Sequence, residues 1–157
     1  MSTNDSEALR LVCFFLREQE IGVPIAAVRE TIRMRPITHV FLTPPWLVGI
    51  FSLRGEIVPA IDLAPWLGMG PTVVTAESRL VVLAWEGKVL GVLADALSEL
   101  RVVAPEAITA PPPTLSPEQL SVLRGVSSTQ AGVVRILDPA GLLGSERLRA
   151  LATAPST

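Results

Sequence analysis

Residues 49–68, GIFSLRGEIVPAIDLAPWLG, set out the local structure around which the rest of the chain is organised. Residues 50–53 and 57–61 are mostly apolar, and the second run is rich in β-branched side chains, as buried strands are. Arg54-Gly55 between them predicts a hairpin turn, because glycine tolerates the positive φ that a reversal needs. Asp62 stands where a helix N-cap is expected. The stretch therefore predicts strand, turn, strand and a capped helical turn, with Arg54 held between two largely buried strands.

The composition indicates a folded domain and excludes several classes of protein. The chain has 157 residues, of which 49% are hydrophobic and 18% charged, so it is one compact domain or two small lobes that share a core. The net charge of −2, without a long basic run, argues against nucleic acid as the principal partner. Apolar runs such as residues 11–16 are far shorter than the roughly 20 residues that span a bilayer, so no direct membrane insertion is expected.

The ends of the chain and its single cysteine indicate a cytoplasmic protein. Residues 1–10 are polar and mildly acidic, which predicts a flexible tail rather than a signal peptide. Cys13 lies in an apolar run and is expected to be a buried, inert thiol. With one cysteine no disulfide can form within the chain, which fits a reducing compartment.

The spacing of apolar runs and turn signals predicts an all-β fold of the sandwich or barrel class. We expect a helical segment at 26–32, a short turn or helix at 95–97, a proline-rich loop at 104–117 and a C-terminal helix at 138–151. The strands are too closely spaced for crossover helices, which disfavours a parallel doubly wound sheet. The predicted strands are residues 11–16, 21–25, 33–40, 50–53, 57–61, 79–85, 89–93, 100–103, 120–127 and 132–137.

An internal repeat divides the chain into two similar halves. Shifting the sequence by 69 residues places Leu11 on Leu80 and Gly22 on Gly91. Further along, residues 54–55 match 124–125 and residues 58–62 match 134–138, after a short insertion in the second half. Two five-stranded antiparallel barrels would follow, the first from residues 11–70 with C-terminal elements and the second from 78–137.

The sequence offers little support for catalysis or for a bound cofactor. Asp62 and Asp138, one from each half, invite comparison with an aspartic-type hydrolase dyad, but neither lies in a D-[ST]-G loop. N-capping of the following turn is the simpler role for both. His39 is the only histidine, and one His with one Cys cannot form a tetrahedral zinc site. No phosphate-binding glycine motif is present, so we expect no metal, no cofactor and no enzyme activity.

Recognition remains as the expected role, and Arg54 and Glu30 are its candidate residues. Arg54 lies between two apolar strands, and Glu30 closes the VRE segment that follows the second predicted strand. A partly buried Arg54–Glu30 pair is therefore expected to fix geometry more than it adds stability. The alternative is that both side chains are solvated surface charges.

At these residues the chain resembles the CheW-type coupling proteins of bacterial chemosensory systems. The strongest match is GIFSLRGEIVPAIDL at 49–63, close to the family pattern G-[VI]-x-N-L-R-G-x-[IV]-[VI]-P-[VI]-[VI]-D-L. The resemblance extends from about residue 11 to residue 143. Lesser matches are VRE at 28–30, TP at 43–44, GVLAD at 91–95, RG at 124–125 and ILD at 136–138.

The resemblance implies two SH3-like barrels packed side by side and a non-catalytic adaptor that bridges two partners. These are the cytoplasmic tip of a methyl-accepting chemoreceptor and the regulatory domain of a CheA-type histidine kinase, with recruitment to receptor arrays and a further kinase contact on the second barrel. The implied receptor-binding groove consists of Val28, Glu30, Arg54, Gly55, Gly91, Leu97 and Leu100. The implied kinase-binding residues are Ile37, Val40, Phe41, Leu47 and Val48.

Three positions depart from the family pattern. Ser52 replaces the usual Asn, Thr31 the usual Ile, and Ala94 a common Val. Polar Thr31 and the proline-rich segment 111–117 keep open the alternative of a repurposed module that contacts only one partner.

Overall fold

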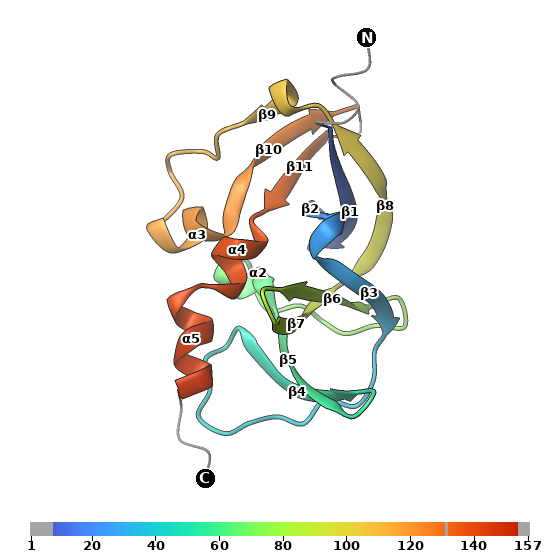
Figure 1. The fold of residues 1–157 in the computed structure, drawn as a ribbon, viewed down its shortest axis with the longest axis vertical. Helices are drawn as coiled ribbons and strands as arrows, with labels where there is room; N and C mark the ends of the chain where they lie inside the picture. The colour runs from blue at the N-terminus through green and yellow to red at the C-terminus, as the bar shows by residue number, and fades with distance from the viewer. Residues whose placement is uncertain (1–7, 131, 154–157) are drawn as a thin grey trace.

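Two closed sheets, one above the other in Figure 1, form the molecule in the computed structural model, which describes residues 8–130 and 132–153. The upper sheet has the strand order β8-β1-β2-β11-β10-β9. The short strand β9 follows β8 and pairs with β10 through Thr109 and Val126, so the sheet closes into a barrel. Its strands are β1 (Leu9–Leu16), β2 (Gln19–Pro24), β8 (Ala96–Val103), β9 (Ile108–Thr109), β10 (Leu123–Thr129) and β11 (Gly132–Leu137).

The lower sheet closes in the same way, with the strand order β3-β6-β7-β5-β4. After β3, Thr38 bridges to Ile50 of β4 through two backbone hydrogen bonds of 2.8 and 2.9 Å. The fold class predicted from the sequence is confirmed, although each sheet contains one parallel pair and the upper sheet has six strands. Its strands are β3 (Val28–Arg33), β4 (Leu47–Leu53), β5 (Glu56–Ile61), β6 (Arg79–Trp85) and β7 (Lys88–Ala94).

Each barrel combines strands from both halves of the chain. Strands β1 and β2 pair with β8 and β11, whereas β6 and β7 pair with β3 and β5. The strand pairing therefore differs from the sequential division into residues 11–70 and 78–137. The two halves exchange their first hairpins, because the chain crosses to the other barrel between β2 and β3 and again between β7 and β8.

The exchange preserves the internal repeat but corrects one of its matches. Ala60 pairs with Gly91 in one parallel pair, and Ile136 pairs with Gly22 in the other, as the repeat requires. Arg54-Gly55 forms the turn between β4 and β5, so its structural counterpart is the turn after Thr129. The sequence match of Arg54-Gly55 to residues 124–125 is wrong, because Gly125 lies in β10 and faces Ile136.

The short helices lie between and beside the barrels (Figure 1). They are η1 (Ile25–Ala27), α2 (Leu63–Trp66), η2 (Pro105–Ala107), α3 (Pro117–Val122), α4 (Pro139–Leu143) and α5 (Glu146–Thr153). Asp62 caps α2 as predicted and accepts hydrogen bonds from the Ala64 amide at 3.0 Å and from Thr72. Asp138 occupies the N-cap position of α4 without a side-chain capping bond, so its predicted role is only positional.

Five local predictions need correction. The strand expected at 120–127 begins only at Leu123, because residues 117–122 form α3. The helix expected at 26–32 is confined to η1, because pairing with β6 draws the β-branched residues that follow into β3. The strand expected at 33–40 is reduced to the Thr38 bridge. The turn expected at 95–97 is largely absorbed by β8, which pairs with β1. The helix expected at 138–151 is divided into α4 and α5 at Gly144.

Most of the buried apolar side chains fall into three clusters. The largest lies between the barrels and combines the outer faces of the β1–β2 and β6–β7 hairpins with α2 and α4; Phe14, Leu83 and Trp66 belong to it. A second fills the lower barrel around Phe51 and Leu80. The third, in the upper barrel around Leu11 and Ile136, has fewer buried apolar residues. The shared cluster joins the two barrels into one unit.

Replacing Gly55 by valine is expected to lower the free energy of unfolding by about 1–3 kcal/mol. Arg54 and Gly55 adopt φ of +49° and +83°, as a type I′ hairpin requires, and a β-branched residue resists such angles. A Cβ at Gly55 would meet no atom within 4 Å, so the cost is backbone strain alone. Urea unfolding measures it, with Gly55→Asn as control because asparagine tolerates this conformation. Equal stability of the two variants would contradict the strain argument.

Candidate binding site

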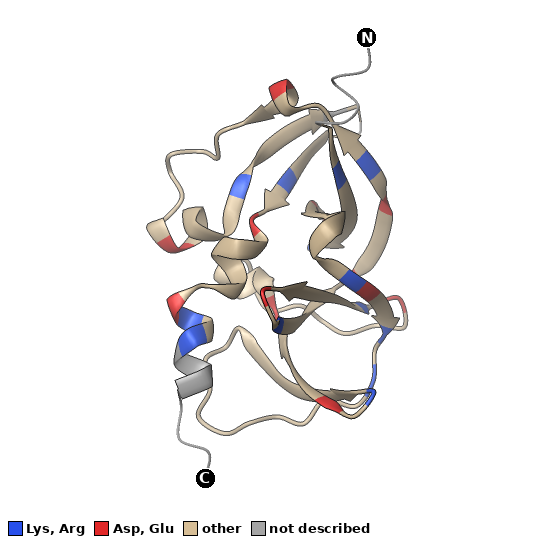
Figure 2. Ribbon diagram, in the orientation of Figure 1, with Lys and Arg blue, Asp and Glu red and all other residues tan. Residues whose placement is uncertain are grey.

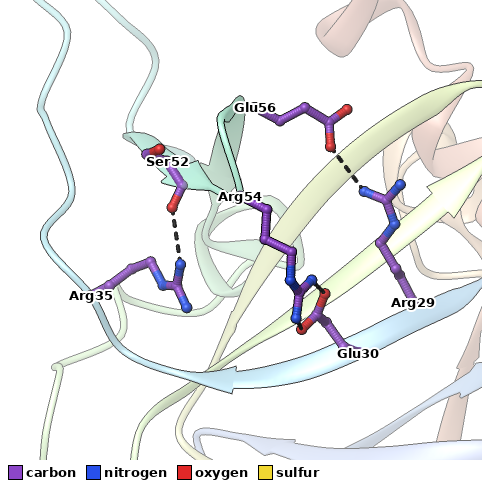
Figure 3. Close-up of polar contacts among 6 residues, drawn as sticks. All are labelled: Arg29, Glu30, Arg35, Ser52, Arg54 and Glu56. Carbon is purple, nitrogen blue, oxygen red and sulfur yellow. Dashed lines mark hydrogen bonds and ion pairs between the residues drawn. The ribbon is translucent and has the colours of Figure 1, made fainter.

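An ion pair joins β3 to the β4–β5 turn on the lower barrel (Figure 3). The Arg54 guanidinium donates two hydrogen bonds to the Glu30 carboxylate, one to each oxygen, and the Nη2–Oε1 distance is 2.9 Å. The Glu30 side chain is 21% exposed, whereas that of Arg54 is 73% exposed. The structure thus brings together two residues that are 24 positions apart in the chain and that the sequence analysis singled out.

Two further arginines reinforce this connection. Arg29 Nη1 lies 3.1 Å from Glu56 Oε2, and Arg35 Nη1 donates to the Ser52 carbonyl oxygen at 3.0 Å. We call these two contacts, together with Arg54–Glu30, the clasp. The register of β3 shifts between Val28 and Glu30, and this irregularity lets consecutive residues Arg29 and Glu30 reach the same turn. The clasp spans the part of the barrel wall where β3 has no neighbouring strand on that side.

The electrostatics of the clasp keep Glu30 ionised. The hydrogen bonds from Arg54 hold the pKa of Glu30 below its usual value of 4.5, against the opposing effect of partial burial, and the charges of Arg54, Arg29 and Arg35 add to the shift. Glu30 in turn raises the pKa of Arg54 above its usual value. Both partners are therefore charged at neutral pH, and the free donors of Arg54 remain open to solvent.

The remaining groove residues lie in different environments. Val28 is half-buried at the start of β3, and Gly55 is exposed beside Arg54. Leu97 and Leu100 of β8 are 40% and 66% exposed, and they belong to the other barrel. Gly91 is buried, and the Phe51 ring occupies the space that a side chain there would need, at 2.7 Å from an added Cβ. Gly91 therefore shapes the barrel interior and is left out of the proposed contact surface.

The predicted kinase-binding residues divide into a buried base and an exposed tip. Ile37, Leu47 and Val48 are half-buried and pack against the apolar clusters. Val40 and Phe41 are 42% and 95% exposed, on the loop between β3 and β4.

Sequence reasoning missed Leu42, which is fully exposed next to Phe41 and adopts a positive φ of +58°. An apolar side chain held in this conformation and in water is typical of a functional surface. Thr43 Oγ1 donates to the Val40 carbonyl oxygen at 2.9 Å and holds the turn. The signal in the sequence was the adjacent apolar pair directly before Thr43. We call residues 40–42 the apolar tip.

A buried charged cluster in the upper barrel was also missed. Glu20 of β2 is 8% exposed and accepts from Arg101 Nε at 2.6 Å, Arg101 Nη2 at 3.1 Å and Ser98 Oγ at 2.9 Å, both partners lying on β8. Cys13 lies on β1 between these strands, and burial with the nearby Glu20 carboxylate raises its pKa to about 12. The thiol is therefore un-ionised and inert, as expected. In the sequence Glu20 directly follows the polar residues 17–19, and nothing there indicates that it is buried or which residue pairs with it.

The contribution of Glu20 to stability is expected to disappear in acid. Burial opposes its ionisation, but the hydrogen bonds from Arg101 and Ser98 prevail and place the pKa below 4.5. A depressed carboxyl pKa stabilises the fold above the unfolded value, and the gain is lost as the pH falls through the folded value. The stability difference between the native protein and Glu20→Gln should be constant from pH 7 to about 5 and shrink below 4.5. Urea unfolding at each pH measures it; a difference unchanged at pH 3 would contradict the assignment.

The described residues offer no candidate metal centre, and the carboxylate of Asp62 is engaged in local hydrogen bonds. Within residues 8–130 and 132–153, no three His, Cys, Asp or Glu side chains cluster as metal ligands. The Asp62 carboxylate is buried and engaged by Ala64 and Thr72. No helix in the described part of the chain is both long and apolar enough to cross a membrane. Fold and site together define a double-barrel protein that exposes a charged clasp and an apolar tip.

Comparison with known proteins identifies the family. The family described as "CheW-like domain" matches residues 10–147, and the chain belongs to it. A probable chemotaxis protein CheW from Rhizobium etli is 33% identical over 82% of this chain and 83% of its own length. The protein FrzA of Myxococcus xanthus is 32% identical, over 89% of this chain and 88% of its own. The crystal structure of the scaffolding protein TtCheW from Thermoanaerobacter tengcongensis matches with a TM-score of 0.75 and 29% identity, over 83% and 84% of the two chains.

Proposed function

We propose that this protein couples chemoreceptors to a CheA-type histidine kinase in a chemosensory pathway by binding both at once. Membership of the CheW-like family makes it a non-catalytic adaptor, so its effect on the kinase must come from geometry. The observation that carries the proposal is that one barrel presents both the clasp, which fixes an exposed arginine, and the separate apolar tip. Two exposed surfaces of different chemistry suit two different partners.

The receptor surface is proposed to consist of Val28, Glu30, Arg54 and Gly55 on the lower barrel with Leu97 and Leu100 on β8. A helical partner, here the cytoplasmic tip of a methyl-accepting receptor, binds an apolar surface through spaced anchors, and a fixed charge sets its register. Glu30 holds Arg54 in one orientation, which lowers the entropy lost on binding.

The kinase surface is proposed to centre on the apolar tip. Phe41 and Leu42 would bury their exposed side chains against the kinase regulatory domain, and Ile37 and Val48 support the loop from below. We place the protein in the cytoplasm, recruited to receptor arrays through these two contacts.

Replacing Arg54 by alanine is expected to weaken receptor binding about tenfold, or by about 1.4 kcal/mol, with the fold intact. The Arg54 side chain is mostly exposed, so its removal costs little stability. Affinity for a receptor-tip fragment and thermal unfolding measure the two effects. Arg33→Ala is the matched control, because Arg33 is an exposed arginine of the same barrel, on the strand β3 that carries Glu30. Unchanged receptor affinity, or loss of the fold, would exclude a groove role for Arg54.

Calorimetric titration with a CheA-type kinase regulatory domain from the same organism tests the second contact. Micromolar binding that is weakened by Phe41→Ala supports the two-partner adaptor. A folded protein that binds the receptor fragment but not the kinase would favour the module with one partner, and polar Thr31, exposed on β3, would then be the first position to exchange.

A further inference from the structure

The two barrels differ at one structurally equivalent place. In the lower barrel the clasp spans the gap between β3 and the β4–β5 turn. The equivalent gap in the upper barrel lies between β8 and the end of the β10–β11 hairpin. The two hairpins correspond, because Leu53 pairs with Glu56 at the end of the β4–β5 hairpin as Thr129 pairs with Gly132 at the end of the β10–β11 hairpin. There the structure has an open pocket of about 730 Å³, lined by Glu99, Arg101, Val103, Ser127, Ser128 and Gln130.

Most of the positions that form the clasp in the lower barrel hold different residues in the upper barrel. Glu99 occupies the place of Glu30, beside the strand irregularity opposite β1. Gln130, however, stands where the lower barrel has Arg54, as the first residue of the turn, and cannot supply a charge. Ser98 likewise stands in place of Arg29, and Ala104 in place of Arg35. The carboxylate of the clasp is thus retained in the upper barrel, whereas its arginines are not.

Charge at the pocket favours a cationic group. Arg101 directs Nε and Nη2 to buried Glu20, and its Nη1 lies 3.3 Å from Glu99. Glu99 and Arg101 line the pocket, whereas Glu20 is buried and takes two of the Arg101 donors. Glu99 therefore keeps only the Nη1 contact, and with 70% of its side chain open to solvent it can accept a further cation. β8 carries these two opposite charges in an otherwise uncharged strand (Figure 2).

The walls of the pocket favour an extended backbone. β8 is an edge strand of its sheet, and β9 pairs with β10 only at Val126 and Ser127, so the wall beyond this short pairing is open. Free strand edges bind an added strand through backbone hydrogen bonds. Leu100 and Val102, 66% and 69% exposed on β8, are available to the apolar side chains of such a strand.

We propose that the gap between β8 and residues 127–130 binds an extended segment of a partner protein that carries an arginine. The guanidinium pairs with Glu99 as Arg54 pairs with Glu30, and neighbouring apolar side chains pack on Leu100 and Val102. Arginine is preferred to lysine because it forms two parallel hydrogen bonds with a carboxylate. This contact surface shares Leu100 with the proposed receptor surface and would add a further point of attachment in an assembly.

The test uses the full chain and the peptide Ac-TVRVT-NH2, followed by amide chemical shifts in NMR titration. The controls are the same peptide with citrulline or lysine in place of arginine. We expect shift changes in β8 and β10 with the arginine peptide, and binding about fivefold weaker with citrulline or with the variant Glu99→Gln. Glu106→Gln, an exposed acidic residue of η2 outside the pocket lining, should leave binding unchanged.

A second variant closes the gap without removing any contact. Gln130→Arg restores the arginine of the lower barrel and should block the peptide about tenfold, whereas Gln130→Ala should leave binding intact. The spectrum of each variant shows whether it is folded. Equal binding of arginine and citrulline peptides, binding insensitive to Gln130→Arg, or no shift changes in β8 and β10 would each overturn the proposal. Receptor and kinase binding are measured separately, so failure of the proposed function would leave this result unaffected.

Discussion

Arg101→Ala is expected to lower the free energy of unfolding by about 3–5 kcal/mol. Removal of the guanidinium leaves the Glu20 carboxylate, 8% exposed, without the partner that offsets its desolvation. The Coulomb attraction of the pair contributes little net stability, because the desolvation of both ions offsets most of it. The large cost of Arg101→Ala arises because the Glu20 carboxylate is left buried without its cationic partner. Urea unfolding followed by tryptophan fluorescence gives the value, since Trp46 and Trp66 are buried in the cluster between the barrels.

The lower barrel supplies a matched control for this prediction. Val89 of the lower barrel is the equivalent of Glu20, because Val89 pairs with Ala84 as Glu20 pairs with Phe15. Ile32 is likewise the equivalent of Arg101, because Ile32 pairs with Leu80 as Arg101 pairs with Leu11. The double variant Glu20→Val with Arg101→Ile should therefore lie within about 1 kcal/mol of the native protein, or above it.

Two outcomes would contradict the role of this pair. If Arg101→Ala cost less than about 1 kcal/mol, the pair would be solvated rather than buried. If the double variant were as unstable as the single one, the charges themselves would be needed for the upper barrel to fold. The thiol of Cys13 offers an independent readout, because its labelling should require opening of the barrel.

Gly49→Ala and Gly125→Ala are expected to cost about 3 kcal/mol each, because each opens one barrel at its seam. An added Cβ would lie 2.3 Å from the Thr38 carbonyl oxygen at Gly49 and 2.5 Å from the Thr109 carbonyl oxygen at Gly125. Both oxygens belong to backbone that pairs with the neighbouring strand at the closure, so neither can move without breaking the pairing.

Gly87→Ala separates the clash from the conformational cost. Gly87 has a φ of +80° but no atom within 4 Å of an added Cβ, so its replacement should cost only about 1 kcal/mol. Hydrogen exchange in the strands of each barrel shows which one has opened. Similar costs for all three substitutions would contradict the tight closure of the seams.

The part of the site that the sequence predicted follows from local patterns. The hairpin at Arg54-Gly55 and its flanking apolar strands were sufficient to predict a fixed arginine, and Glu30 was named as its partner. Arg29 and Arg35 were not predicted, because exposed arginines in a sequence show no sign of the turn that they reach. Glu20 was missed for the same reason, since its partner Arg101 is 81 residues away.

The sequence by itself determined the hairpins and the repeat. The β1–β2, β4–β5 and β6–β7 turns have residues that adopt positive φ between apolar runs. Hairpin contacts join residues close in the chain, so propensity and pattern are enough to specify them. Only the tertiary structure decided which hairpin completes which barrel. The β1–β2 and β6–β7 hairpins have similar apolar faces, so either barrel offers each of them an edge to pair with. The observed exchange places the outer faces of both hairpins against each other in one shared core, and burial between distant segments, which no local pattern records, selects that arrangement.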